Sequence, residues 1–366
     1  MANVRMLVSA LTDVGRARTT NEDAYAVTDL ATGARIEAEA GDHALDVHDH
    51  GVLLALSDGM GGHQAGEVAS ALVLESLQAA MQQAARGSIQ EHLEAAVLRA
   101  NLTVMDAARA ENRRGMGATL TAVFVRGAEA YIAEVGDSRA YLLRNGRLRQ
   151  ITRDQSLVQL MIDHGVMSAE EARHSASKNV ILQAMGLAAD VRVAIARLEL
   201  RRGDRFLLCS DGVTNEVSDD ELKEILSGSE PRAACDTMIA LANDRGGRDN
   251  QTAIVADLGG DGLDPPDEFE TVTSTYEVLQ AFEARLGSAA PTPAGGAAPT
   301  PARHAEPLPD LPDEPAAPAP TAPAPEPPAT ASRTMKLPRT GPTWRTVAIV
   351  AIVLVALLVL MVVLTS

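Results

Sequence analysis

Residues 51–67 read Gly-Val-Leu-Leu-Ala-Leu-Ser-Asp-Gly-Met-Gly-Gly-His-Gln-Ala-Gly-Glu, an apolar run that stops at Asp58 and continues through glycines into an alanine-rich segment. The run predicts a buried strand over 51–58, because it is short and bounded by turn residues. The apolar spacing of 66–85 is typical of a helix. A carboxylate therefore stands where a buried strand leaves a sheet, at a position that the sheet holds rigidly.

Acidic residues occupy the same kind of position twice more. Asp137 follows the largely apolar stretch 132–136, and Asp211 follows 206–210. One such aspartate alone is more often a turn or cap residue. Several that converge would repel one another unless a cation neutralised them, and a site made only of oxygen ligands suits Mg²⁺ or Mn²⁺. The sequence thus predicts a metal site formed by strand-end aspartates.

The remaining pattern indicates a domain that mixes helices and strands. Turn residues at 126–128, 136–138 and Asn145-Gly146 predict that 119–144 is a meander of antiparallel hairpins. We therefore expect an α+β layered domain. Strands are predicted at 4–10, 51–58, 119–126, 128–135, 138–144, 191–200, 204–210 and 251–258. Helices are predicted at 66–85, 89–111, 218–227 and 231–243.

The charge balance excludes several classes of protein. The chain has 366 residues and a formal net charge of -17, all of it carried by residues 1–285. Such an acidic domain repels nucleic acid, so no nucleic-acid partner is expected. Two cysteines exclude a disulfide framework and favour a reducing compartment. Residues 1–20 contain no continuous apolar run, so we expect no secretory signal.

The C-terminal part has a different composition. Of the 19 prolines, fourteen lie in 291–328, so a disordered linker is expected there. Residues 347–364 are all apolar, enough for one transmembrane helix. Basic residues just before this run place the N-terminal part in the cytoplasm by the positive-inside tendency. The expected domains are a catalytic domain at 1–258, an acidic extension at 259–287, a linker at 288–343 and a membrane anchor at 344–366.

Six short motifs follow one another between about residues 5 and 258. They are Thr12-Asp13-Val14-Gly15-Arg16 with Arg18 and Asn21-Glu22-Asp23, Ser57-Asp58-Gly59-Met60-Gly61-Gly62-His63 with Ala65-Gly66-Glu67, Gly117-Ala118-Thr119, Val135-Gly136-Asp137-Ser138-Arg139, Ser210-Asp211-Gly212, and Asp249-Asn250. Together they resemble the bacterial form of the metal-dependent serine/threonine protein phosphatases of the protein phosphatase 2C class.

The resemblance implies a four-layer α-β-β-α sandwich, a central β-sandwich flanked by helices, with two tightly bound Mn²⁺ or Mg²⁺ ions at one end. The two ions would lower the pKa of a water that bridges them, and this water would attack phosphorus in line. The ligands implied are Asp58 as the bridge, the Gly59 carbonyl and Asp23 for one ion with Glu22 acting through water, Asp211 and Asp249 for the other ion, and Asp137 for a possible third and weaker ion.

Arg18 is the phosphate-binding residue that the resemblance implies. It lies five residues before Asp23, as in the family pattern, and its guanidinium can offer a planar fork to phosphate oxygens. Many family members carry a candidate acid for the leaving group two residues after the bridging aspartate, where this chain has Met60. The nearest histidine, His63, is therefore the candidate acid here.

Residues 154–186 resemble the flap that covers the site in the family. The usual His-Pro pair reads His174-Ser175, and the usual Arg-Asn pair reads Lys178-Asn179. Loss of the proline should loosen the loop without removing chemistry. We expect a change in substrate handling, with His174 as a candidate substrate-binding residue.

Histidines and cysteines outside these motifs have simpler interpretations. His43, His48 and His50 lie in a polar insertion, which is expected to be a solvated loop, with a metal site as the alternative. Cys209 lies in an apolar strand and is predicted to be a core residue. A cysteine-dependent phosphatase mechanism is excluded, because the arginine required six positions after the nucleophile is absent for both cysteines.

Three functions remain in view. The first is a metal-dependent phosphatase that acts on phosphoserine and phosphothreonine in proteins and opposes a bacterial Ser/Thr kinase at the membrane. The second is a catalytically silent module that binds phosphoproteins at the membrane, whose signature would be lost metal ligands. The third is a domain that controls a transcription partner, which usually comes with sensor domains. The predicted ligands are all present, so the sequence favours the first.

Overall fold

The structure is a computed structural model that describes residues 3–61, 64–83, 87–110, 113 and 115–284. The chain divides into two units, 1–295 and 296–366, and every described residue belongs to the first unit. His63, the predicted linker and the predicted membrane span lie outside the described residues. Within the described part of the chain, no helix has the length and apolar character needed to cross a membrane.

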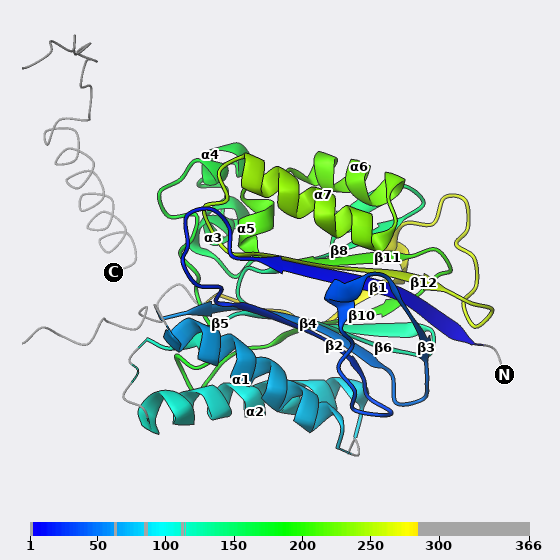
Figure 1. Cartoon of the computed structure of the whole chain (residues 1–366), viewed down its shortest axis with the longest axis horizontal. Helices are drawn as coiled ribbons and strands as arrows, with labels where there is room; N and C mark the ends of the chain where they lie inside the picture. Colours follow the sequence, from blue (N-terminus) through cyan, green and yellow to red (C-terminus); the bar gives the residue numbers. More distant parts are fainter. Residues whose placement is uncertain (1–2, 62–63, 84–86, 111–112, 114, 285–366) are drawn as a thin grey trace, which may run out of the picture. The chain divides into compact units, whose positions relative to one another are not determined.

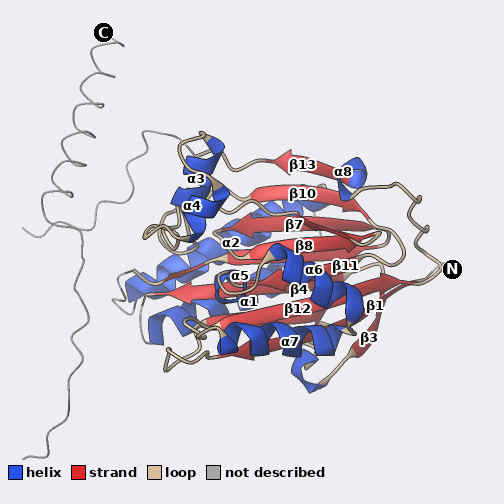
Figure 2. Cartoon of the chain, turned by 90° about the horizontal axis from the view of Figure 1, so that it is seen from above, coloured by secondary structure: helices blue, strands red, loops and turns tan. Residues whose placement is uncertain are grey.

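Two antiparallel sheets face each other and form the centre of this unit (Figure 1). Their strands lie roughly along a common direction (Figure 2), as in aligned sandwiches. From edge to edge, the first sheet contains β3 (His43–Val47), β1 (Val4–Asp13), β12 (Gln251–Gly259), β11 (Arg205–Cys209), β8 (Arg139–Arg144) and β9 (Arg147–Gln150). The second contains β13 (Tyr276–Gln280), β10 (Ala194–Glu199), β7 (Glu129–Val135), β6 (Leu120–Arg126), β4 (Val52–Met60) and β2 (Asp23–Asp29), with β5 (Gly117–Ala118) paired to the end of β4.

Helices cover the outer face of each sheet. Two helices, α1 (Gln64–Met81) and α2 (Ile89–Ala110), pack on the second sheet. The other two long helices, α6 (Asp219–Gly228) and α7 (Pro231–Asp244), pack on the first sheet. Figure 1 shows the resulting order of layers, which is helix, sheet, sheet, helix. The predicted α+β sandwich is therefore confirmed for the described residues.

Strand β4 shows why a continuous apolar run was the right signal for this fold. Leu53 and Ala55 pack in the layer that contains α1 and α2, whereas Leu54 and Leu56 pack in the layer between the sheets. All four side chains are 1% exposed or less. A strand covered on both faces has no polar side to alternate with. Truncating one of these leucines to alanine would cost about 2–5 kcal/mol of stability.

The predicted meander over 119–144 is only partly right. β6 and β7 pair as a hairpin, and β8 pairs with β9 through the Asn145-Gly146 turn. β7 and β8 lie in different sheets, however, so residues 136–138 carry the chain across the sandwich. Gly136 has a φ of 116°, and a Cβ there would lie 2.7 Å from Thr119 Cγ2. Turn residues marked the change of direction but did not show which sheet the next strand joins.

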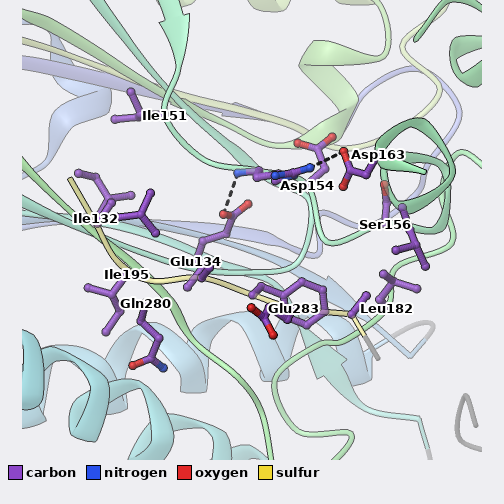
Figure 3. Close-up of a pocket in the computed structure, with 18 of the residues that line it drawn as sticks. Ile132, Glu134, Ile151, Asp154, Ser156, Asp163, Leu182, Ile195, Gln280 and Glu283 are labelled. Atoms are coloured by element: carbon purple, nitrogen blue, oxygen red, sulfur yellow. Dashed lines mark hydrogen bonds and ion pairs between the residues drawn. The ribbon is translucent and has the colours of Figure 1, made fainter. Parts of the chain in front are cut away.

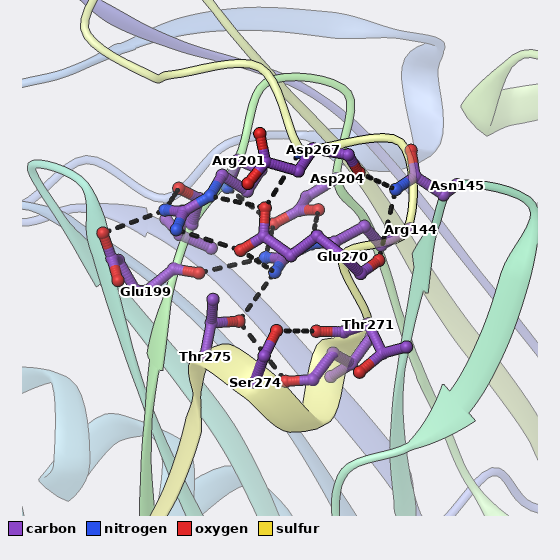
Figure 4. A network of polar contacts seen from close by, with 12 residues as sticks. Arg144, Asn145, Glu199, Arg201, Asp204, Asp267, Glu270, Thr271, Ser274 and Thr275 are labelled. Carbon is purple, nitrogen blue, oxygen red and sulfur yellow. Dashed lines mark hydrogen bonds and ion pairs between the residues drawn. The ribbon is translucent and has the colours of Figure 1, made fainter.

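Residues beyond 258 belong to the folded domain, so the predicted boundary is too early. β13 pairs with β10 and forms an edge of the second sheet. Arg144 pairs with Asp204 at 2.6 Å, and these side chains are 1% and 0% exposed. Glu270 lies 3.7 Å from the same arginine (Figure 4). The predicted acidic extension thus supplies an edge strand, and it supplies a carboxylate that lies near the buried Arg144 guanidinium.

The predicted flap contains two short helices, α3 (Leu157–Asp163) and α4 (Ala169–Arg173). Ser156 Oγ accepts a hydrogen bond from the Gln159 N–H and caps α3, and Ser168 forms a capping box at the start of α4. Figure 1 shows both helices at the same end of the sandwich as β5 and α5 (Asp211–Thr214). These helices are too short to give a clear helical period in the sequence.

Candidate active site

Four aspartates come from strand ends of the two sheets. Asp23 begins β2 and lies directly opposite Asp58, which stands near the end of β4. Asp211 follows β11 as the first residue of α5, and Asp249 lies two residues before β12. β11 and β12 are neighbours in the first sheet, and Ser210 and Thr252 at their ends donate to Asp23, so both pairs lie at one end of the sandwich. The predicted convergence of strand-end carboxylates is therefore present.

Asp23 links the two sheets. Its Oδ2 accepts hydrogen bonds from Ser210 Oγ and Thr252 Oγ1, each at 2.7 Å. Its Oδ1 is buried and has no hydrogen-bond partner among the described residues. A buried carboxylate oxygen without a donor is costly. The position beside this oxygen therefore favours a cation or a hydrogen-bond donor.

Burial and mutual repulsion raise the pKa values of these carboxyl groups. Removal from water raises the pKa of Asp23 to about 7 and that of Asp211 to about 6, and the charge of Asp249 adds to both shifts. Desolvation also raises the pKa of Asp58 well above its ordinary value, and the charges of Asp23, Asp211, Asp137 and Asp249 raise it further. Asp58 thus lies at the electrostatic centre of the group. We call these five aspartates the aspartate cluster.

The aspartate cluster fits divalent cations by its chemistry. Bound cations would favour the ionised carboxylates and offset their repulsion. The donors are oxygens, which suit Mg²⁺ and Mn²⁺, and Asp23 Oδ1 has an unused lone pair. Across the described ranges, no three His, Cys, Asp or Glu side chains lie in an arrangement that could hold a metal ion. The fit therefore rests on the unpartnered oxygen and the concentrated negative charge.

Gly59 and Gly66 allow the start of α1 to approach the aspartate cluster. A Cβ on Gly59 would lie 2.2 Å from the Gly66 carbonyl oxygen, and a Cβ on Gly66 would lie 2.6 Å from the Glu22 carboxylate. The Gly59 N–H donates to the Glu22 carbonyl at 3.1 Å. Any side chain at either glycine would push these segments apart, so their close packing requires glycine.

Asn250 orders the loop that carries Arg18 and Glu22. Its Oδ1 accepts a hydrogen bond from the Glu22 N–H at 2.8 Å. Its Nδ2 donates to the carbonyls of Val14 and Thr20 at 3.0 and 2.9 Å. No role for this residue was predicted from the sequence, where its position beside Asp249 was the only signal.

Arg18 lies beside the aspartate cluster and contacts Asp249. One of its Nη atoms donates to Asp249 Oδ2 at 2.8 Å. Half of the arginine side chain is exposed (50%). The guanidinium has five N–H donors in a planar fork, so it can bind a second anion while it stays near the carboxylates. A half-exposed guanidinium therefore lies at the edge of the aspartate cluster.

Asp137 stands on the segment that crosses between the sheets. Burial raises its pKa to about 8, and the charges of Asp211 and Asp154 add to the shift. Arg139, two residues later, holds Asp154 by bonds of 2.9 Å to Oδ1 and 2.7 Å to Oδ2. The Gln155 N–H donates to the Gly136 carbonyl at 2.8 Å. These contacts fix the crossing segment against the start of the flap.

A groove of about 640 Å³ runs between the aspartate cluster and the flap. Asp137 and Asp211 line it, together with His174 and Lys178 from the flap. Lys178 Nζ donates to Asn215 Oδ1 at 3.1 Å. His174 therefore shares a groove with two of the predicted metal ligands, whereas the structure does not describe His63.

The remaining sequence candidates lie outside the site. His43 belongs to the edge strand β3 opposite Val8, so the predicted loop contains a strand. Neither it nor His48 and His50 joins a metal-binding group in the described part of the chain. Cys209 is fully buried, as predicted, and burial raises the pKa of its thiol.

Comparison with known proteins gives a consistent picture. The model of the family described as protein phosphatase 2C matches residues 40–248. The serine/threonine protein phosphatase PstP of Mycobacterium tuberculosis is 38% identical over 261 residues, which are 70% of this chain and 46% of PstP. This chain thus covers less than half of that relative's length. The serine/threonine phosphatase stp of Listeria monocytogenes is 36% identical over 215 residues, which are 57% of this chain and 85% of stp.

Solved structures share this fold. The crystal structure of PstP from Mycobacterium tuberculosis has 38% sequence identity and a TM-score of 0.60, and the match covers 70% of this chain and 99% of that chain. A structure of the PstP catalytic domain in complex with two manganese ions has 37% identity and a TM-score of 0.59, with the same coverage.

Proposed function

The chain belongs to the protein phosphatase 2C family, and on this premise we propose that it hydrolyses phosphoserine and phosphothreonine in proteins with two Mn²⁺ or Mg²⁺ ions. One observation carries the proposal: Asp58 lies at a strand end where the charges of four other aspartates raise its pKa. The related PstP domain that binds two manganese ions supports the same chemistry.

The proposed ligands divide between the two sheets. Asp58 would bridge the ions from β4. The Gly59 carbonyl and Asp23 would hold one ion, with Glu22 acting through water. Asp211 and Asp249, which flank β11 and β12, would hold the other. The hydrogen bonds from Ser210 and Thr252 to Asp23 keep one of its oxygens fixed, so the free oxygen faces a defined position.

The chain's own residues would bind and orient the substrate. When bound, the ions supply a water of lowered pKa and neutralise charge on the phosphoryl group. Arg18 would hold phosphate oxygens through its planar fork, and His174 would contact the substrate in the groove. His63 is the proposed proton donor for the leaving serine or threonine oxygen. A third, weaker ion is proposed at Asp137 and Asp211.

The alternative function is a catalytically silent module that binds phosphoproteins. A silent module would be expected to lack some of the metal-binding carboxylates. The predicted aspartates are all present in this chain, and burial or mutual repulsion raises the pKa of four of them. These observations favour hydrolysis over binding alone.

We also propose that residues 347–364 anchor the protein in the cell membrane, with the catalytic domain facing the cytoplasm and opposing a bacterial Ser/Thr kinase there. The support is the length of the apolar run and the basic residues before it. Membrane fractionation of the full chain and of a chain ending at Ala284 tests the anchor. If the shorter chain stayed with the membrane, 347–364 would not be the anchor.

Hydrolysis of a phosphothreonine peptide tests the catalytic proposal. EDTA should abolish phosphate release by the full chain, and added Mn²⁺ should restore it, because the attacking water depends on the ions. Full activity in EDTA would rule out metal-dependent hydrolysis, and peptide binding without release under any metal would favour the silent module.

A further inference from the structure

A second cavity, of about 480 Å³, lies beside β7, β10 and β13 (Figure 3). Its volume falls in the range of small-molecule sites. Apolar side chains form much of the wall, among them Ile132 and Ile151, which pack between the two sheets. None of the residues proposed to bind metal or phosphate lines this cavity, and it adjoins the groove of the candidate active site at Asp154 and Ser156, which line both.

Glu134 is an acid buried in the wall of this cavity. Its side chain comes from β7, and the residue is 3% exposed. Its Oε2 accepts a hydrogen bond from the Arg153 N–H at 3.0 Å (Figure 3). Its Oε1 is buried and has no partner among the described residues. An unsatisfied buried acceptor costs about 1–3 kcal/mol, and a ligand that donates a hydrogen bond would recover this cost.

The other charges around the cavity define the charge of such a ligand. Arg153 pairs with Asp163 at 2.5 Å, and Asp154 pairs with Arg139 at 2.7 Å. These pairs cancel, which leaves the acids Glu134 and Glu283 in excess. Burial, and then the charge of Asp154, raises the pKa of Glu134 well above its ordinary value. A cation beside the carboxylate would offset both effects.

We propose that this cavity binds a small organic amine, with its apolar part against the isoleucines and its protonated nitrogen donating to Glu134 Oε1. The cavity provides both parts of the required chemistry, which are an apolar wall and one unpartnered buried acceptor. Neither part depends on the proposed phosphatase activity.

Calorimetric titration of the full chain with 2-phenylethylamine tests the proposal, and 2-phenylethanol is the matched neutral probe. The amine should bind, and the affinity of the alcohol should be lower by about tenfold or more, because a charged hydrogen bond contributes more than a neutral one. The titrations are run with saturating Mn²⁺, so that the amine does not compete for the aspartate cluster. Failure of the amine to bind, or equal binding of the two probes, would overturn the proposal.

Two variants locate the binding. Glu134→Gln keeps the size and the carbonyl acceptor for the Arg153 N–H but removes the acid, so amine binding should fall about tenfold or more. Ala194→Leu places a larger side chain directly opposite Glu134 on β10, and it should reduce binding of both probes. Circular dichroism confirms that each variant is folded. Amine affinity that is unchanged in both folded variants would place the site elsewhere and contradict the proposal.

Discussion

Arg18 and Asp249 form an ion pair of 2.8 Å at the edge of the aspartate cluster. The residue proposed to hold phosphate is therefore bound to a residue proposed to hold a metal ion. The guanidinium and a divalent cation would compete for the same carboxylate, since both are attracted to its negative charge. Substrate binding and metal binding should therefore be coupled through this pair.

Arg18→Gln is expected to raise KM for a phosphothreonine peptide about tenfold or more, because a charged hydrogen bond to phosphate is lost. The same variant should bind Mn²⁺ more tightly, since Asp249 no longer has a competing partner. Steady-state kinetics and calorimetry measure the two effects. Arg16→Gln, in the same exposed loop, is the control. Unchanged KM and unchanged metal affinity would show that the ion pair contributes neither to substrate binding nor to metal binding.

Asp58→Asn is expected to lower turnover by about 100-fold or more, because the central charge of the aspartate cluster is removed. Asp106→Asn removes an exposed aspartate on α2 and should leave turnover unchanged. Phosphate release from the peptide at saturating Mn²⁺ measures both. An Asp58 variant as active as the control would contradict the bridging role.

Asp137→Asn is expected to keep the two tight ions and to lose a weak metal-binding event together with most of the turnover. The reason is that a site with few protein ligands and several waters fills only at high metal concentration. Calorimetric titration with Mn²⁺ and peptide assays are run on the same samples. If metal stoichiometry and activity are unchanged and only the melting temperature falls, Asp137 is a turn residue.

The EDTA-treated protein is expected to lose stability as pH rises from about 4 to about 8. The folded-state pKa values of Asp23, Asp211 and Asp137 are raised to about 7, 6 and 8, above the usual value of about 3.9 in an unfolded chain. The folded state therefore binds more protons over this range, and the free energy of unfolding falls with rising pH.

Thermal unfolding at pH 5.5 and pH 8 measures this dependence. The melting temperature in EDTA should be higher at pH 5.5, and Mn²⁺ should raise it more at pH 8, where the carboxylates are ionised. Asp58→Asn should reduce the difference between the two pH values. A melting temperature that rises from pH 5.5 to pH 8 in EDTA would contradict the assigned shifts.

Asp204→Asn is expected to destabilise the domain by about 3 kcal/mol, because it removes the closer of the two carboxylates that pair with the buried Arg144 guanidinium. Turnover of the folded variant should change little, since Asp204 and Asp211 lie at opposite ends of β11. Urea unfolding and peptide assays measure the two effects. Glu277→Gln, which removes an exposed partner of Arg197, is the control and should change stability little.

The sequence predicted those parts of the fold that depend on local pattern. Strand β4 has both faces buried, so its apolar run stood out, and α1 and α2 are long enough to show a helical period. β2 was not predicted, because its residues 23–29 mix polar and apolar side chains and lie beside a motif that was interpreted only as a metal site. β13 was missed because its five residues mix polar, charged and apolar side chains, and because it follows an acidic stretch.

The aspartates of the candidate site were predicted from the sequence because each stands at the end of an apolar strand or in a family motif. The contacts that organise them were not. Ser210 and Thr252 reach Asp23 across the space between two sheets, and Asn250 binds a loop near the start of the chain. Such contacts depend on which sheet each strand joins, and this was the point at which the prediction for 136–138 was wrong.

The pairing of β1 with β12 constrains how the newly synthesised protein folds. Its register runs from Arg5 opposite Gly259 to Asp13 opposite Gln251. At about 5–20 residues per second, the ribosome needs on the order of ten seconds or more to deliver this partner. Until then β1, whose apolar residues Met6 and Val8 are buried in the native domain, lacks one of its two neighbouring strands. The nascent chain therefore exposes these residues during translation, and the aspartate cluster is complete only when Asp249 has left the ribosome.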